Sequence, residues 1–157
     1  MEREALITAM KSSISEVLET MFFLPLEFAG NTKPGELWDS DRGEIIVSKL
    51  NFTGPFAGYF VLFVPKELAL SLAASFLGKD EASISQDHVA QTVKEIINMI
   101  AGSTFGIFDD QSVFDLDIPE LVRFAELRKD HSDSKGGIFI AVNTLESRLA
   151  VQMIIGS

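Results

Sequence analysis

The sequence contains no cysteine and only two histidines among its 157 residues. Without cysteine the chain has no disulfide bond, no thiol nucleophile and no zinc–thiolate site. His88 and His131 are too few for most histidine-based metal sites, and they give no basis for a Ser–His–Asp catalytic arrangement. These absences remove the common thiol- and histidine-based classes of site.

Basic residues are also scarce. The chain has 13 lysines and arginines against 23 acidic residues, which gives a formal net charge of -10. Nucleic acids and anionic membrane surfaces bind cationic patches, so this charge argues against both as partners. It does not exclude a protein partner that carries a basic patch.

Long apolar runs and nucleotide-binding glycine motifs are missing too. No stretch approaches the roughly 18 consecutive apolar residues of a transmembrane helix, and the opening MEREALITAM carries early acids, unlike a signal peptide. Neither G-x-x-x-x-G-K-[ST] nor G-x-G-x-x-G occurs, so no phosphate-binding loop is expected. We therefore expect a cytoplasmic protein without a membrane span.

The apolar content is sufficient for one folded domain spanning 1–157 with a substantial core, since 46% of the residues are hydrophobic. Alternating or continuous apolar runs predict strands at 24–28, 44–52, 59–64, 113–118, 138–145 and 148–155. Helical spacing predicts helices at 3–23, 66–77 and 87–108, loops are expected at 30–43 and 129–137, and 121–128 fits either a strand or a helix. We expect an α/β (α+β-like) fold in which two long helices pack on one antiparallel or mixed sheet of about six strands.

A few residues mark the predicted helix boundaries. Pro25 ends the first helix, Pro65 fits the first turn of the next, and Gly78 closes it. The long helix after that can be capped by Ser85, or by Ser83 in a capping box.

The segment 87–108 has the most regular amphipathic pattern in the chain. At about 100° per residue, an apolar group falls within about 60° of Val93, namely Val89, Ile96, Ile97, Ile100 and Thr104. A narrow polar stripe lies on the opposite face and consists of Gln91, Glu95, Asn98 and Gly102. Because Glu95 and Asn98 are three residues apart, their side chains are neighbours on the helix surface.

Two interpretations of Glu95 and Asn98 are open at this point. The simpler one is a solvated helix face. However, Asn98 is a poor residue for a helix interior, and Gly102 costs roughly 1 kcal/mol there relative to alanine. A small residue beside an acid and an amide lets another surface approach closely, which favours a docking face.

Four aspartates follow this helix, and they suggest a cation site only weakly. Asp109, Asp110, Asp115 and Asp117 lack the ligand order and the terminal glutamate of a calcium-binding EF-hand loop. We expect Asp115 and Asp117 to face solvent on one side of a strand, and we expect no metal site in the chain.

The two long helices suggest an internal repeat with an offset of 79 residues. The apolar positions Met10, Ile14, Val17, Leu18 and Met21 then align with Val89, Val93, Ile96, Ile97 and Ile100. Glu16 aligns with Glu95, and Glu19 aligns with Asn98. Much of this agreement is expected of any two amphipathic helices. If the repeat is real, the fold is a duplicated helix-plus-strands unit with pseudo-repeats of roughly 1–78 and 79–157.

The stretch EIINMIAG at 95–102 resembles the signature helix of the CheC/CheX/FliY family of chemotaxis phosphatases. EVLETMFF at 16–23 resembles the first helix of the CheX branch, VPKELALSLAASFLG at 64–78 the segment between the two halves, and FDLDIP at 114–119 the strand after the signature. Pro119 fits a proline of the family motif, whereas Gln91 stands where the family often has Asp or Ser. The resemblance covers most of the chain and implies the CheC-like fold.

The resemblance also implies an activity in chemotaxis signalling. The substrate would be a CheY-like response regulator whose receiver domain carries an aspartyl phosphate and supplies the Mg²⁺, while this chain binds no cofactor. Glu95 would pair with the active-site lysine of the receiver, and Asn98 would orient the attacking water. Gln91, Met99 and Gly102 would complete the face that docks the partner.

Further expectations follow from the same resemblance. Glu16 and Glu19 would form a degenerate, non-catalytic second site, because a carboxylate in place of the amide repels a phosphoryl group and donates no hydrogen bond. A homodimer is implied as well. The rival interpretation is a non-catalytic adaptor that binds response regulators, like the FliM-type domains of the flagellar switch. A small-molecule binding domain has no supporting motif.

Overall fold

The apolar runs of the sequence form one antiparallel sheet in the computed structural model, which describes residues 3–30, 44–123, 137–145 and 147–156. The strands are β1 (Glu27–Phe28), β2 (Ile45–Thr53), β3 (Gly58–Pro65), β4 (Asp115–Leu116), β5 (Glu120–Val122), β6 (Ile138–Asn143) and β7 (Arg148–Ile155). Within these described ranges the sheet has seven strands in the order β1-β6-β7-β3-β2-β4, and β5 also pairs with β2. The sheet is thus purely antiparallel and slightly larger than the sequence suggested.

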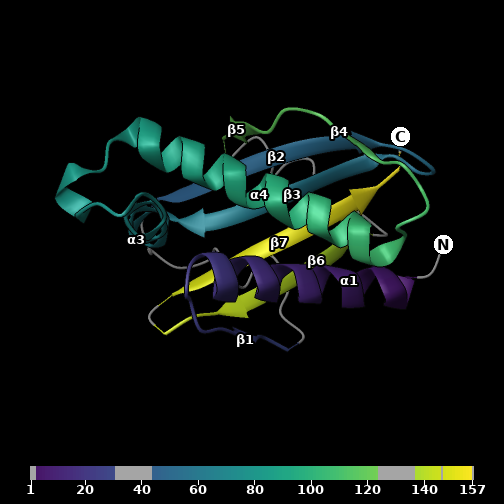
Figure 1. The fold of residues 1–157 in the computed structure, drawn as a ribbon, viewed down its shortest axis with the longest axis horizontal. Coiled ribbons are helices and arrows are strands. Elements are labelled where there is room, and N and C mark those ends of the chain that lie inside the picture. The colour runs from purple at the N-terminus through teal and green to yellow at the C-terminus, as the bar shows by residue number, and fades with distance from the viewer. Residues whose placement is uncertain (1–2, 31–43, 124–136, 146, 157) are drawn as a thin grey trace.

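In the described part of the chain three helices lie on one face of the sheet, namely α1 (Arg3–Ser15), α3 (Lys66–Leu77) and α4 (Gln86–Phe108). Figure 1 shows α1 and α4 side by side and antiparallel across this face, with α3 beside the start of α4. Two short helical turns complete the described elements, η1 (Glu16–Met21) and η2 (Glu81–Ser83). The prediction of two long helices packed on a sheet is confirmed.

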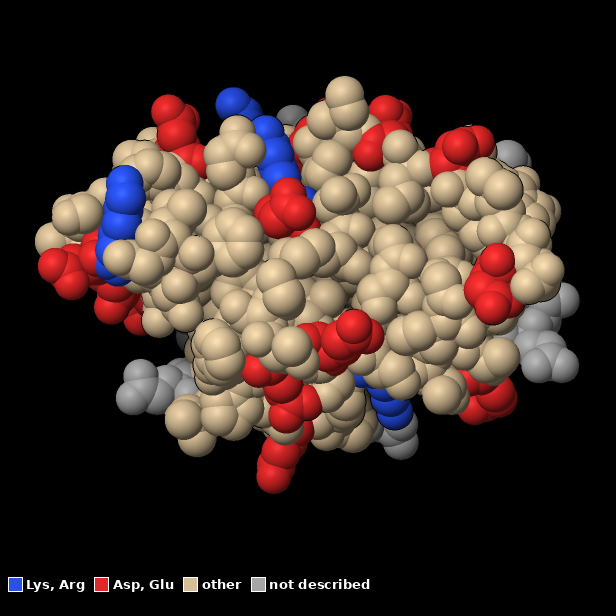
Figure 2. Space-filling model, in the orientation of Figure 1, with Lys and Arg blue, Asp and Glu red and all other residues tan. Residues whose placement is uncertain are grey.

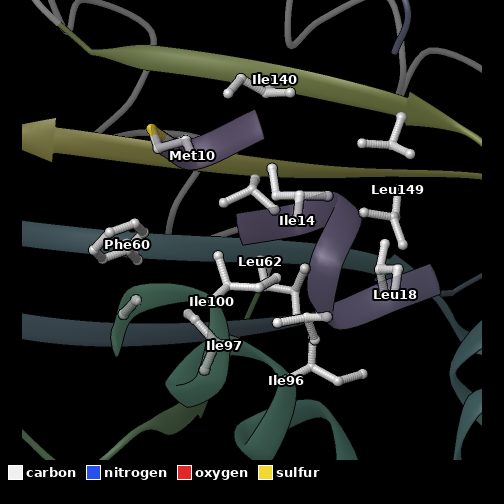
Figure 3. Packing of buried hydrophobic residues seen from close by; sticks show 14 of the residues in the cluster. Met10, Ile14, Leu18, Phe60, Leu62, Ile96, Ile97, Ile100, Ile140 and Leu149 are labelled. Atoms are coloured by element: carbon white, nitrogen blue, oxygen red, sulfur yellow. The ribbon is translucent and has the colours of Figure 1, made fainter. Parts of the chain in front are cut away.

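The main core lies between the helices and the sheet. Ile14, Leu62 and Ile100 lie at the centre of Figure 3, and Met10, Leu18, Phe60 and Ile97 around them belong to the same buried cluster. Each of these labelled side chains is essentially inaccessible to solvent. Burial of this aliphatic surface, at about 25 cal/mol per Å², holds α4 rigidly on the sheet.

Strand β3 is apolar on both faces, which explains its uninterrupted run of hydrophobic residues. Phe60 and Leu62 belong to the main core, whereas Val61 and Phe63 belong to a second, smaller cluster. Because side chains alternate along a strand, these two clusters occupy opposite faces of the sheet. Gly58 begins β3 where a Cβ atom would lie 2.0 Å from the Ile154 carbonyl oxygen, so only glycine fits beside β7.

The first helix departs from the predicted continuous α-helix over 3–23. From Glu16 to Met21 the chain is π-helical, and a π-turn contains more residues than an α-turn. The buried face therefore shifts along the chain, so that Met21 is 47% exposed and Phe22 is buried in its place. The expectation that Met21 occupies a core position equivalent to Ile100 was wrong for this reason.

Other predicted boundaries changed in smaller ways. The strand expected at 113–118 is reduced to Asp115–Leu116, and Pro65 ends β3 and precedes α3 rather than lying in its first turn. Gly78 closes α3 in the left-handed conformation, as predicted. The described part of 121–128 begins as the end of strand β5. Of the loop expected at 30–43, only Gly30 is among the described residues. Of the loop expected at 129–137, only Gly137 is, and His131 therefore lies outside the described residues.

Candidate active site

Helix α4 begins with a capping box that decides between the two predicted caps. The Ser85 hydroxyl accepts a hydrogen bond from the His88 backbone N–H at 3.1 Å, and His88 Nδ1 accepts one from the Ser85 N–H at 3.1 Å. Two amide groups at the helix start are thereby satisfied. His88 is half-buried, and this capping bond is its structural role.

The polar stripe predicted on α4 lies on its outer face. Gln91, Glu95 and Gly102 are exposed and Asn98 is half-buried, whereas Ile96 and Ile97 beside them are fully buried. Met99 is half-buried and packs against the core cluster. In Figure 2 much of the surface over the helices is uncharged, several acidic side chains gather at the lower centre, and a few basic side chains are scattered over the face. The helix thus presents an acid and an amide on a rigid support.

Neither Glu95 nor Asn98 is engaged by another described residue. Across the part of the molecule that the structure describes, no hydrogen bond, ion pair or ring contact involves either side chain. An exposed carboxylate can remain solvated at little cost, but a half-buried amide usually finds a partner in its own chain. The hydrogen-bonding groups of both side chains are therefore available to another molecule.

Gly102 and Gly106 are not required by the fold. A Cβ atom at Gly102 would make an ordinary contact with Leu116 Cδ1 at 3.9 Å, and one at Gly106 would meet nothing within 4 Å. Neither glycine has a positive φ angle. Since both are exposed on the side of Glu95 and Asn98, they extend a face with little side-chain relief. Sequence reasoning missed Gly106, although its four-residue spacing from Gly102 is a signal for such a surface.

Two flanks border this face. On one side Leu116 lies next to Gly102, and Phe114 stacks on Phe105 with ring centres 3.9 Å apart. On the other side the Ser103 hydroxyl donates to the Glu16 carboxylate at 3.5 Å. The face is therefore bordered by the segment with Phe114 and Leu116 on one side and by the end of the first helix on the other.

The two glutamates of the first helix lie in a different environment from the α4 pair. Glu19 accepts a hydrogen bond from the Ser15 hydroxyl, and Glu16 accepts the one from Ser103. Both lie in the π-helical segment, where residues three apart are rotated further from each other than in an α-helix. The first helix does not repeat the geometry of Glu95 and Asn98.

The aspartates after α4 form a turn. The Asp109 carboxylate accepts hydrogen bonds from the Ser112 hydroxyl at 2.6 Å and the Gln111 backbone N–H at 3.1 Å. These bonds, the one from Ser112 first, lower the pKa of Asp109 from its usual 3.8. Asp115 and Asp117 are both exposed, as expected. Among the described residues, no group of three or more acidic or histidine side chains could hold a metal ion.

Comparison with known sequences identifies the family. A sequence model described as "Chemotaxis phosphatase CheX" matches residues 46–143, which include all of α4. The chain belongs to the CheX chemotaxis phosphatase family. Members of this family dephosphorylate phospho-CheY, so the resemblance and the enzyme class inferred from EIINMIAG are confirmed. No curated protein sequence matches significantly.

Solved structures agree with the CheX fold. A chain in the crystal structure of the CheX–CheY–BeF3–Mg²⁺ complex from Borrelia burgdorferi has a TM-score of 0.74 at 19% identity, covering 97% of this chain and 98% of that chain. CheX from Vibrio vulnificus has a TM-score of 0.72 at 21% identity and covers 96% of each chain. The FliM middle domain from H. pylori has a TM-score of 0.54 at 13% identity, covering 99% of this chain and 93% of that chain. At these identities the agreement concerns the fold.

No helix in the described ranges is long and apolar enough to cross a membrane.

Proposed function

We propose that this chain hydrolyses the aspartyl phosphate of a CheY-like receiver domain, with Glu95 and Asn98 as the residues that act on the partner. The observation that carries the proposal is the unengaged acid–amide pair on the outer face of α4, in a member of a phosphatase family. Gln91, Met99 and Gly102, together with Gly106, form the docking face around it.

Glu95 anchors the partner. Its exposed carboxylate has no cation of its own among the described residues. A lysine in the receiver's active site would form a charge-assisted pair with it, and such pairs are stronger than neutral hydrogen bonds. This pairing sets the orientation of α4 over the phosphoryl group.

Asn98 orients the attacking water. Its carboxamide both accepts and donates hydrogen bonds and adds no negative charge near the phosphate. Phosphoryl transfer depends mostly on positioning and charge stabilisation. A hundredfold acceleration requires only about 3 kcal/mol, which orientation of one water can supply.

The metal ion in this scheme belongs to the receiver. The complex from Borrelia burgdorferi contains Mg²⁺ together with CheY. Glu95 and Asn98 supply one carboxylate and one amide, which do not make a Mg²⁺ site by themselves. We therefore assign no cofactor to this chain. A cytoplasmic homodimer, implied by the family resemblance, is part of the same proposal.

The test is phosphate release from a phosphorylated receiver. Asn98→Ala and Glu95→Ala should each lower the accelerated rate at least tenfold, with Asn98→Ala acting on kcat and Glu95→Ala mainly on KM. Glu19→Ala should leave the rate within twofold, because the first helix has no catalytic amide. Full activity in both α4 variants would contradict the assignment of Glu95 and Asn98 as the active residues. A large loss of activity in Glu19→Ala would contradict the proposal that the second site is non-catalytic.

The rival function is a non-catalytic adaptor, and the similarity in fold to the FliM middle domain is the reason to consider it. An adaptor would bind the phosphorylated receiver without changing the rate of phosphate loss. An amide at position 98 has no necessary role in such a protein, and the unengaged state of Asn98 therefore favours the enzyme.

A further inference from the structure

Among the described residues, a buried hydrogen bond joins helices α1 and α4, which otherwise pack mainly through aliphatic side chains. The Ser13 hydroxyl donates a hydrogen bond to the Ile100 carbonyl oxygen at 2.8 Å. Ser13 is fully inaccessible to solvent, and so is Ile100. The two residues are 87 positions apart, so this bond depends on the tertiary structure.

The Ile100 carbonyl is an unusual acceptor because it already lies in the helical hydrogen-bond pattern of α4. Its expected partner is the N–H of Thr104, four residues later. The Thr104 hydroxyl lies in the same turn, is fully buried, and has no hydrogen-bond partner among the described residues. Two buried hydroxyls thus lie close to this turn of α4 in the sequence or by contact, and of the two only that of Ser13 makes a hydrogen bond to the neighbouring helix.

A hydrogen bond between two helices can fix their relative axial position and rotation, which aliphatic packing alone leaves adjustable. Ridges of isoleucine and leucine side chains tolerate small sliding and rotation, whereas a hydrogen bond weakens steeply with distance and angle. Single buried polar residues are known to set the register of paired helices. The bond to Ile100 is made two residues after Asn98, on the same rigid helix.

We propose that Ser13 is a positioning residue that fixes the axial position and rotation of α4, and through it the placement of Asn98 and Glu95 against the partner. This inference rests on the proposed function. Any shift of α4 along its axis moves the Asn98 amide by the same amount. A displacement of about 1 Å in a catalytic group can cost on the order of a hundredfold in rate.

The kinetic test compares Ser13→Ala with Thr104→Val in the full chain. Ser13→Ala removes the bonded hydroxyl, and we expect kcat for receiver dephosphorylation to fall about tenfold while KM stays within twofold. Thr104→Val removes a buried hydroxyl from the next turn of α4 without removing a hydrogen bond, and we expect both constants to stay unchanged. Equal losses of kcat in the two variants would show general loosening and would overturn the proposal.

A structural readout separates this inference from the proposed function. The chain has no cysteine, so nitroxide labels at Glu4→Cys and Asp87→Cys, both exposed, would report the axial relation of α1 and α4 alone. Ser13→Ala should shift or broaden the label–label distance by about 1.5 Å, one helical rise. Thr104→Val should leave it unchanged. An unchanged distance in Ser13→Ala overturns the inference even if the wild type is an active phosphatase. A wild type that does not accelerate phosphate loss overturns the proposed function instead.

One further variant guards against a failure of Ser13→Ala to fold. Ser13→Cys keeps the shape of the side chain at a slightly larger size and replaces the hydroxyl by a weaker donor. Measured without labels, it should show an intermediate loss of kcat at unchanged KM. Wild-type kcat in this variant would contradict the positioning role.

Discussion

Asn98 and Glu95 have no hydrogen-bond or ion-pair partner among the described residues. Ser85, His88, Ser103 and Asp109 all form hydrogen bonds that shape α4 or its ends. The acid and the amide form none. The described structure therefore gives no reason for a half-buried asparagine at position 98. A hydrogen bond to a partner protein would explain it.

Gly102 allows a test of the docking face at a single position. Gly102→Ala should raise the free energy of unfolding by about 0.5 to 1 kcal/mol, because alanine favours helices and its Cβ fits beside Leu116 at 3.9 Å. Gly102→Leu should fold but bind the receiver at least tenfold more weakly, because its side chain occupies the space of the partner. Thermal unfolding and receiver titration measure the two effects, and tight binding by Gly102→Leu would argue against this face.

Asp109 makes stability depend on pH in a defined direction. Its pKa is lowered from 3.8 in the folded chain, first by the Ser112 hydroxyl and then by the Gln111 N–H. The folded state therefore binds its proton less readily than the unfolded state, and the stabilisation is complete above about 3.8 and lost as the pH falls through the lowered value. The difference in Tm between wild type and Asp109→Asn should shrink over that range. Ser112→Ala should raise the pKa of Asp109 in an NMR titration, and no change would contradict this account.

At the scale of the element, α4 is defined by its own sequence, whereas the first helix is not. Every position predicted to face the core between Val93 and Thr104 is buried, because an α-helix turns by a constant angle. The turn from Glu16 to Met21 widens instead, and Phe22 then stacks on Phe76 of α3 with ring centres 5.3 Å apart. A contact with another element thus accompanies the change in helix geometry.

The start of α4 gives a prediction that separates stability from activity. Ser85→Ala should cost about 1 kcal/mol of unfolding free energy, because the capping box with His88 is lost. The dephosphorylation rate should stay within twofold, since Asn98 lies several turns further along the helix. Ser83→Ala is the matched control, because Ser83 is exposed and its hydroxyl caps nothing. Similar destabilisation by both variants would contradict the assigned cap.

At the scale of the whole molecule, β3 from the first half of the chain (1–78) pairs with β7 from the second half (79–157). Six registered pairs run from Gly58 opposite Ile155 to Phe63 opposite Ala150. Strand β1 pairs with β6, and β4 and β5 pair with β2, so each part of the chain also borders the other at the sheet edges. This exchange is the topology expected of a duplicated unit with twofold symmetry, and the duplication itself stays a prediction.

A cluster of phenylalanines fixes the end of α4 on the sheet and should dominate the stability of this region. Phe105 is 5% exposed and contacts the rings of Phe52, Phe56, Phe60 and Phe114. Phe105→Ala should cost about 3 to 5 kcal/mol in denaturant unfolding. Phe23→Ala provides a matched control with an expected effect within about 0.5 kcal/mol, because that ring is 81% exposed. A small effect at Phe105 would show that the cluster is not a packed core.

The fold class and the outer stripe of α4 could be predicted from the sequence, because periodicity along one helix dictates which side chains face away from the core. The sequence could not give the strand order, since the pairing of β3 with β7 depends on contacts between distant segments. It also misplaced Met21, where local periodicity predicts burial and the π-turn exposes the side chain. The tertiary structure alone decided that Ser13 reaches the Ile100 carbonyl and that Glu95 and Asn98 find no partner in the described chain. Ser13 and Ile100 are far apart in the sequence, and only the packing of α1 on α4 brings them within hydrogen-bonding distance.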